Sequence, residues 1–193
     1  MTTDNFRKHT TKNSLQKFLI NVFYDVVIRE IQSIQPRTIL DAGCGEGFTL
    51  EKLREHNVGE ELEGVDLAHA VNLGRQMYPH LTLKVGSIYA LPYADDSFDV
   101  VICSEVLEHL EYPEKALHEL RRVTKRYCVI TVPHEPFFRL ANFLRGKNIS
   151  RWGNDIEHIQ HWSRRGITRL VKKYFTVRKV KTSFPWTIVV VEK

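Results

Sequence analysis

Long apolar runs are absent from this 193-residue sequence. The longest, such as Thr187–Val191, are far too short for a membrane-spanning helix, which needs about 20 apolar residues. The first residues also lack the apolar stretch that is typical of a secretory signal peptide. We therefore expect no transmembrane segment and a cytoplasmic location.

Cysteine is also scarce. The sequence has three cysteines, and no two of them have the C-x-x-C spacing of many metal and redox motifs. An odd number without that spacing argues against a disulfide framework and indicates reduced thiols in a reducing compartment. The three residues are Cys44, Cys103 and Cys128.

Long runs of like-charged residues are absent from the sequence. The sequence has 28 Lys and Arg against 23 Asp and Glu, which gives a formal net charge of +5. Because these basic residues are scattered, the positive charge is weak evidence for nucleic-acid binding. The net charge therefore permits an anionic partner without indicating nucleic acid, and the oligomeric state stays open.

Short apolar runs alternate with helix-like segments along most of the chain. Strands joined by helical crossovers form a parallel sheet with helices on both faces, so the order predicts a doubly wound α/β fold. Few residues separate the last two strands, so the final strand should pair antiparallel. The predicted strands are 37–42, 61–66, 81–86, 98–104, 127–133, 175–182 and 186–193, and the predicted helices are 47–56, 68–77, 113–125 and 163–173.

The length suits a single domain. We divide it into an N-terminal helical cap (1–35), a core (36–133), an insertion (134–162) and a final helix with two strands (163–193). Apolar residues in 14–34 recur at helical spacing, with Asn13 or Ser14 as the capping residue. This helix either covers the sheet or closes over a ligand.

The stretch ILDAGCGEGF (39–48) places glycines at 43, 45 and 47 directly after the first strand. A dinucleotide fingerprint would need glycine at position 48, which is phenylalanine, and the phosphate-binding P-loop motif is absent. Asp41 and Glu46 flank the turn. A carboxylate about 4–5 Å from a phosphate would cost on the order of 3–4 kcal/mol at an effective dielectric constant of about 20. The turn therefore favours a cation, such as an ammonium or a sulfonium.

Asp66 ends the second predicted strand, where a carboxylate commonly grips the hydroxyls of a ribose. Leu67 beside it offers an apolar surface to an adenine. With these residues the sequence resembles the class I S-adenosylmethionine-dependent methyltransferases, in particular their small-molecule, type 11-like branch. The resemblance spans residues 37–133 and is carried, in order, by ILDAGCGEGF, GVDLA, GSIYALPYADDSFDVVICSEVLEHL and YCVITVP.

The resemblance implies a Rossmann-like fold, S-adenosylmethionine as cofactor, S-adenosylhomocysteine as product and methyl transfer to a small molecule. It implies that the loop after the first strand holds the methionine part, that Asp66 binds the ribose and that Leu67 flanks the base. Ser87 stands where the family commonly has an acidic residue. The implied cofactor contacts are Asp41, Gly43, Cys44, Gly45, Asp66, Leu67, Ser87, Ile88, Ser104, Glu105 and Val106.

Methyl transfer from a sulfonium depends mainly on in-line positioning, and a general base is needed only for a protonated acceptor. His109, His134 and His161 are the candidate catalytic residues because histidine titrates near neutral pH. In the related enzymes the position of His109 often shapes the pocket rather than acting as a base.

His158 and His161 would share one face if their segment were helical. With Asp155 or Glu157 they could hold a metal ion. Two histidines in a polar loop are more often surface groups, so we predict no metal site.

The insertion mixes aromatic residues with Arg139, Arg145, Lys147 and Arg151. It could be an ordinary amphipathic cap, a site for an acceptor with apolar and anionic parts, such as a lipid- or nucleotide-linked sugar, or a peripheral membrane contact. Two other functions stay open: an RNA or protein methyltransferase, and a non-catalytic cofactor-binding regulator. The segment after the fourth strand lacks the Asn/Asp-Pro-Pro-aromatic run of enzymes that methylate nucleobase amino groups.

Overall fold

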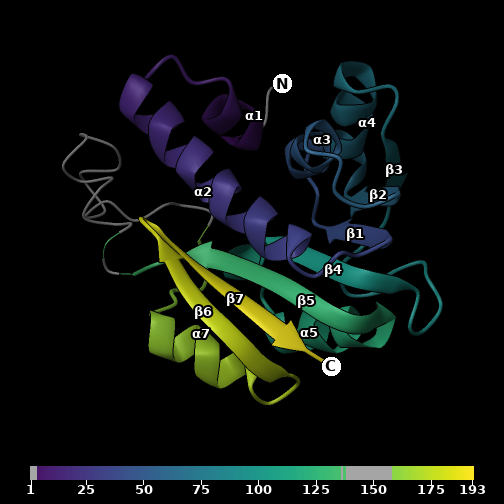
Figure 1. Ribbon diagram of the computed structural model, residues 1–193, viewed down its shortest axis with the longest axis vertical. Helices are drawn as coiled ribbons and strands as arrows, with labels where there is room; N and C mark the ends of the chain where they lie inside the picture. The colour runs from purple at the N-terminus through teal and green to yellow at the C-terminus, as the bar shows by residue number, and fades with distance from the viewer. Residues whose placement is uncertain (1–3, 136, 138–157) are drawn as a thin grey trace.

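A seven-stranded sheet forms the centre of the molecule (Figure 1). The computed structural model describes residues 4–135, 137 and 158–193. The strand order is β3-β2-β1-β4-β5-β7-β6; β1 to β5 are parallel, and β7 runs antiparallel to both of its neighbours. The predicted fold class and the antiparallel last strand are confirmed. The strands are β1 (Thr38–Ala42), β2 (Glu61–Asp66), β3 (Thr82–Val85), β4 (Phe98–Ser104), β5 (Thr124–Pro133), β6 (Thr176–Ser183) and β7 (Trp186–Glu192).

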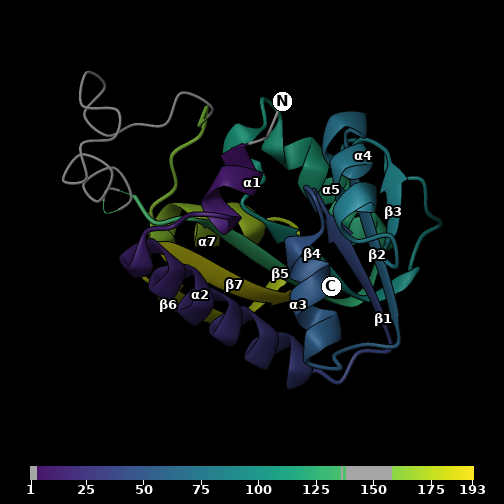
Figure 2. The ribbon, with the colours of Figure 1, turned by 90° about the horizontal axis from the view of Figure 1, so that it is seen from above.

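Helices cover both faces of the sheet, and Figure 2 shows α2 and α3 on one side and α5 and α7 on the other. Two short elements, α1 and the 3-10 helix η1, lie near the carboxyl ends of the parallel strands. The helices are α1 (Asp4–His9), α2 (Ser14–Gln32), α3 (Phe48–Glu55), α4 (Ala68–Met77), η1 (Leu107–His109), α5 (Pro113–Val123) and α7 (Arg164–Val171).

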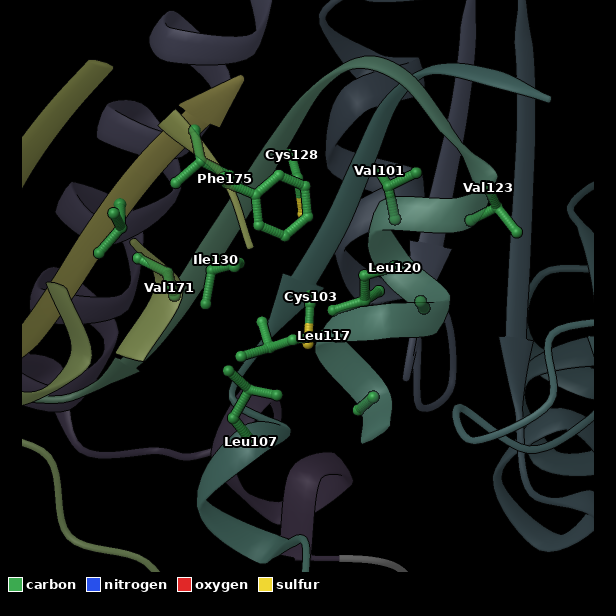
Figure 3. Close-up of a cluster of buried hydrophobic side chains, with 14 of the residues drawn as sticks. Val101, Cys103, Leu107, Leu117, Leu120, Val123, Cys128, Ile130, Val171 and Phe175 are labelled. Atoms are coloured by element: carbon green, nitrogen blue, oxygen red, sulfur yellow. The ribbon is translucent and has the colours of Figure 1, made fainter. Parts of the chain in front are cut away.

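The core has two halves because successive side chains of a strand point to opposite faces of the sheet. Ile39 packs with residues of α2 and α3, whereas Leu40 packs with α5 and α7. Figure 3 shows the second half, where Leu120 of α5 and Val171 of α7 lie over β4 and β5. All three cysteines are buried and unpaired, as predicted.

Helix α2 begins after Asn13, whose side chain accepts a hydrogen bond of 3.0 Å from the Gln16 backbone N–H. Of the two capping residues considered, Asn13 is therefore the one used. Phe23, Val27 and Ile31 recur at helical spacing and are buried against the sheet. The helix covers the sheet, and its first turns also line the cavity described below.

One predicted helix boundary is wrong, and one helix was not predicted. The helix predicted over 113–125 ends at Val123, because Thr124 already pairs with Phe98 as the first residue of β5. Helix α1 was not predicted. The segment 158–163 is not helical, so helical spacing does not place His158 and His161 on one face.

Asp155, Glu157 and the four cations named in the insertion lie outside the described residues. In the part of the chain that the structure does describe, no helix combines the length and the apolar character needed to cross a bilayer.

Candidate functional site

A cavity of about 1440 Å³ lies at the carboxyl ends of β1, β2 and β4. Pockets for single small ligands typically measure roughly 300–1,000 Å³, so this cavity has room for a cofactor and a second molecule. The loops after β1 to β4, helices α1 and α2 and the start of β7 contribute to its wall. The predicted site residues that line it are Gly43, Cys44, Gly45, Asp66, Leu67, Ser87, Ile88, Ser104, Glu105, Val106 and His109.

The turn after β1 requires glycine. Gly43, Gly45 and Gly47 have φ values of 88°, 55° and 93°, a region that other residues rarely adopt. A Cβ atom on Gly43 would lie 2.4 Å from Val106 Cγ2, and one on Gly45 would lie 2.6 Å from Asn5 Nδ2. The backbone of this turn therefore forms the cavity wall directly, where a ligand can approach it closely.

Asp66 is fixed between the turn and α4. Its carboxylate accepts hydrogen bonds of 2.6 Å from the backbone N–H groups of Gly45 and Leu67. Burial raises the pKa of Asp66, its two backbone hydrogen bonds oppose the rise, and the charge of Glu46 adds to it. Leu67, the next residue, is 67% exposed. An apolar side chain is therefore accessible to a ligand beside the Asp66 carboxylate.

Asp41 is buried below the turn and does not line the cavity. Burial raises its pKa to about 7, the charge of Asp66 adds to the rise, and the nearby Thr49 hydroxyl opposes it. Among the described residues, neither carboxylate oxygen of Asp41 has a partner with hydrogen-bond geometry. A buried carboxylate in this position is stabilised by a positive charge in the cavity.

Glu46 is a third carboxylate near the glycine turn, in addition to Asp41 and Asp66. Glu46 is fully buried and accepts a hydrogen bond of 2.6 Å from Asn5 Nδ2 of helix α1. Three carboxylates around a glycine turn repel a phosphate chain and attract a cation. The residues present therefore fit S-adenosylmethionine, which carries a sulfonium and an ammonium.

Glu105 connects three distant parts of the chain. The Trp186 indole N–H donates a hydrogen bond of 2.6 Å to Glu105 Oε2, and Lys8 Nζ lies 3.5 Å from the same oxygen. Lys8 also stands 5.0 Å from the centre of the Trp186 ring. Helix α1, the loop after β4 and the start of β7 thus meet at one carboxylate on the cavity wall.

Glu108 lies further along the same wall and is 1% exposed. Both of its carboxylate oxygens are buried without a hydrogen-bond partner in the described part of the structure. Burial raises the pKa of Glu108 well above its usual range, and the charge of Glu105 adds to the rise. Glu108 was not predicted as a site residue. It lies in the segment SEVLEHL, which supports the family resemblance but assigns no role to this glutamate.

The structure separates the candidate histidines. His109 lines the cavity, and so does His158, whose ring centre lies 5.0 Å from that of His109. The backbone N–H of His134 donates to the Pro185 carbonyl, and its imidazole does not reach the cavity wall. Burial lowers the pKa of His134, and the charge of Arg164 contributes.

His161 also lies outside the cavity lining, with Nδ1 3.8 Å from Glu135 Oε1. The sequence predicted His161, in the insertion, as a candidate for activating the acceptor. His158, in the same segment, lines the cavity instead.

Trp186 and the α1 residues were not predicted as part of the site. Helix α1 carries no motif that distinguishes it. Trp186 had a usable signal, since it opens a strand that pairs antiparallel with β5 and lies opposite Pro133 at the carboxyl end of that strand. A residue in that position necessarily lies at the ligand-binding edge of the sheet.

Comparison with known proteins is consistent with this geometry. Residues 40–130 match the family model described as "Methyltransferase domain". The chain is 33% identical over 105 residues to a ubiquinone biosynthesis O-methyltransferase of Hydrogenovibrio crunogenus, covering 51% of this chain and 42% of that relative. It is 31% identical over 101 residues to a demethylmenaquinone methyltransferase of Renibacterium salmoninarum, covering 52% and 42%. The chain thus spans less than half the length of these curated relatives.

Among solved structures, the fold is similar to that of a magnesium protoporphyrin IX methyltransferase from Synechocystis with bound S-adenosylhomocysteine. The TM-score is 0.72 with 18% sequence identity, over 97% of this chain and 91% of that chain. At this identity the likeness concerns the fold, and the match of residues 40–130 carries the family. Residues 40–130 of the chain therefore form a class I S-adenosylmethionine-dependent methyltransferase domain.

Proposed function

We propose that the protein transfers the methyl group of S-adenosylmethionine to a small-molecule acceptor. The observation that carries this proposal is a cavity of about 1440 Å³, which is larger than the pocket of a single small ligand and has a cation-attracting glycine turn in its wall. The bound cofactor would supply a methyl group already activated by its positively charged sulfur. The protein then has to bind, orient and exclude water.

The cofactor contacts stay as predicted from the resemblance, with one refinement. Gly43 and Gly45 would receive the methionine part at the backbone, and Asp66 the ribose hydroxyls. Because Asp41 lies below the turn, we assign it an electrostatic role toward the positive charges rather than a direct contact. Leu67 and Ile88, with Ser87, would enclose the base.

The acceptor would occupy the part of the cavity beyond Glu105. Apolar side chains line that part, among them Leu19 of α2, and Phe137 and Phe184, whose ring centres lie 6.2 Å apart. Such a wall suits an acceptor with a ring or chain of apolar character. The names of two curated relatives refer to quinone biosynthesis, which supports an acceptor of this class.

Of the three histidines predicted for the acceptor side, His109 has the strongest support because it lines the cavity. His134 and His161 remain predictions, and an acceptor that reaches past Phe137 would be needed for His134 to act. His134 and Phe137 are in ring contact, with centres 5.2 Å apart.

The test uses S-adenosylmethionine labelled in its methyl group with pools of small metabolites, total RNA and total protein. We expect label in the metabolite pool, extractable into organic solvent. Label in RNA or protein would favour those acceptor classes instead. Cofactor binding in calorimetry with no transfer to any pool would support a regulatory module.

The test variant is Asp66→Ala, which should lose cofactor binding and labelling together. Its matched control is a second Asp→Ala variant outside the cavity. Asp95→Ala, an exposed carboxylate paired with Arg122 and absent from the cavity lining, should lose neither.

A further inference from the structure

Three potential metal ligands meet at the acceptor end of the cavity. A carboxylate oxygen of Glu108 and one ring nitrogen each of His109 and His158 lie within 4.8 Å of one another. Two ligand atoms on opposite sides of an ion are about 4.2 Å apart when each bond is about 2.1 Å, so only a small inward movement is needed. All three residues line the cavity.

The backbone holds this cluster together. Glu108 and His109 belong to η1, where the His109 N–H donates to the Val106 carbonyl at 3.0 Å. The N–H groups of Ile159 and Gln160 both donate to the Glu108 carbonyl at 2.9 Å. These bonds bring His158 beside η1 although about 50 residues separate the two segments in the sequence.

Within this cluster, the carboxylate of Glu108 is a buried group without a hydrogen-bond donor among the described residues. It points into a cluster of ligand atoms. Buried carboxylates are normally paired or bound to a metal, because an isolated buried charge is costly. Its neighbour Glu105 does not have this need, since Trp186 already donates to it.

We propose that Glu108, His109 and His158 bind one divalent transition-metal ion at the acceptor end of the cavity. No metal site was predicted from the sequence, and the one considered there used His158 and His161 instead. Here the carboxylate comes from η1 rather than from the insertion.

The donor set decides the class of ion. Two imidazoles with one carboxylate suit Mn²⁺, Fe²⁺, Co²⁺ or Zn²⁺, whereas Mg²⁺ and Ca²⁺ prefer oxygen ligands throughout. Three protein ligands leave coordination positions open toward the cavity. If the proposed function is correct, these positions would take oxygen atoms of the acceptor and orient it. His109 would then act as a metal ligand rather than as a general base.

Titration of the full chain with Co²⁺ tests the site without any methyl acceptor. We expect calorimetry to give one ion per chain, and the visible absorption of Co²⁺ to change in the same titration. Mg²⁺ at the same concentration should give neither signal. Because the measurement needs neither cofactor nor acceptor, its failure would leave the proposed methyl transfer untouched.

Three variants locate the ion: Glu108→Gln, His109→Asn and His158→Asn. Each should weaken Co²⁺ binding more than about tenfold, the smallest loss that changes around metal ligands commonly cause. His118→Asn removes an exposed imidazole of α5 outside the cavity and should bind Co²⁺ like the original chain.

Melting curves without metal check that each variant folds. If Co²⁺ binds to Glu108→Gln and to the original chain with equal affinity, or if the original chain binds none, the proposal is overturned.

Discussion

The cofactor end and the acceptor end of the cavity are built in different ways. At the cofactor end the residues stand at or just after the end of a strand: Gly43 and Gly45 follow β1, and Asp66 is the last residue of β2. At the acceptor end, Glu105 is held by Lys8 and Trp186, which lie at opposite ends of the chain. The first arrangement depends on short segments at the ends of neighbouring strands, whereas the second depends on how distant segments pack.

The consequence concerns function. A local loop can keep the same cofactor while the distant segments change, so the acceptor end can vary without loss of the cofactor site. Four experiments test this division, beginning with the largest expected effect.

Gly43→Ala should give the largest loss of stability, because Gly43 packs directly against Val106 in the loop after β4. Its Cβ would overlap Val106 Cγ2, and its φ of 88° is unfavourable for alanine. Left-handed strain costs about 1–2 kcal/mol and overpacking adds about 1–3 kcal/mol, so we expect the free energy of unfolding to fall by about 2–5 kcal/mol. Urea unfolding measures it. Gly166→Ala, in α7 with an ordinary φ, should change stability little.

Asp66→Ala should remove the stabilisation that the cofactor gives. At about a hundred times its dissociation constant, a ligand stabilises the folded state by roughly 2.7 kcal/mol. The original chain should show this gain as a rise in melting temperature on addition of S-adenosylmethionine, and the variant should show almost none. An equal rise in both proteins would remove Asp66 from the cofactor site.

Trp186→Phe tests the long-range construction of the acceptor end. The variant loses the hydrogen bond to Glu105 while keeping an aromatic ring, and a hydrogen bond to a charged group contributes about 1.5–3 kcal/mol. We expect a comparable loss of stability in urea unfolding followed by circular dichroism. Trp162→Phe is the matched control, since the Trp162 indole N–H has no partner among the described residues. Equal losses would show that packing, not the bond to Glu105, is responsible.

The smallest effect concerns the charge of Asp41. With its pKa raised to about 7, this carboxylate gains a proton as the pH falls below neutrality, and its attraction for a cation falls with it. Between pH 7 and 5.5 the affinity for S-adenosylmethionine should therefore drop by up to about tenfold, because each pH unit below the pKa reduces the ionised fraction about tenfold. In Asp41→Asn this part of the pH dependence of cofactor affinity should disappear. Calorimetry measures the dissociation constant at both pH values for both proteins. An equal change of affinity with pH in the two proteins would contradict the prediction.

Prediction from the sequence reached further at the cofactor end, because its residues lie in short segments at the strand ends. Ten of the eleven residues predicted to contact the cofactor line the cavity, and their roles stay predictions. Asp41 is the exception, because it lies inside β1 and is buried. At the acceptor end the sequence named His161 as a catalytic candidate, whereas His158 is the one that lines the cavity.

Local patterns in the sequence were enough to predict the alternation of strands and helices in the core, the glycine turn and the family resemblance, because hydrophobic periodicity and turn residues act over short distances. Three contacts could be found only in the folded chain: α1 against the turn, Trp186 with Glu105, and His158 with Glu108 and His109. Such contacts depend on the packing and register of segments far apart in the chain, and no local pattern records them.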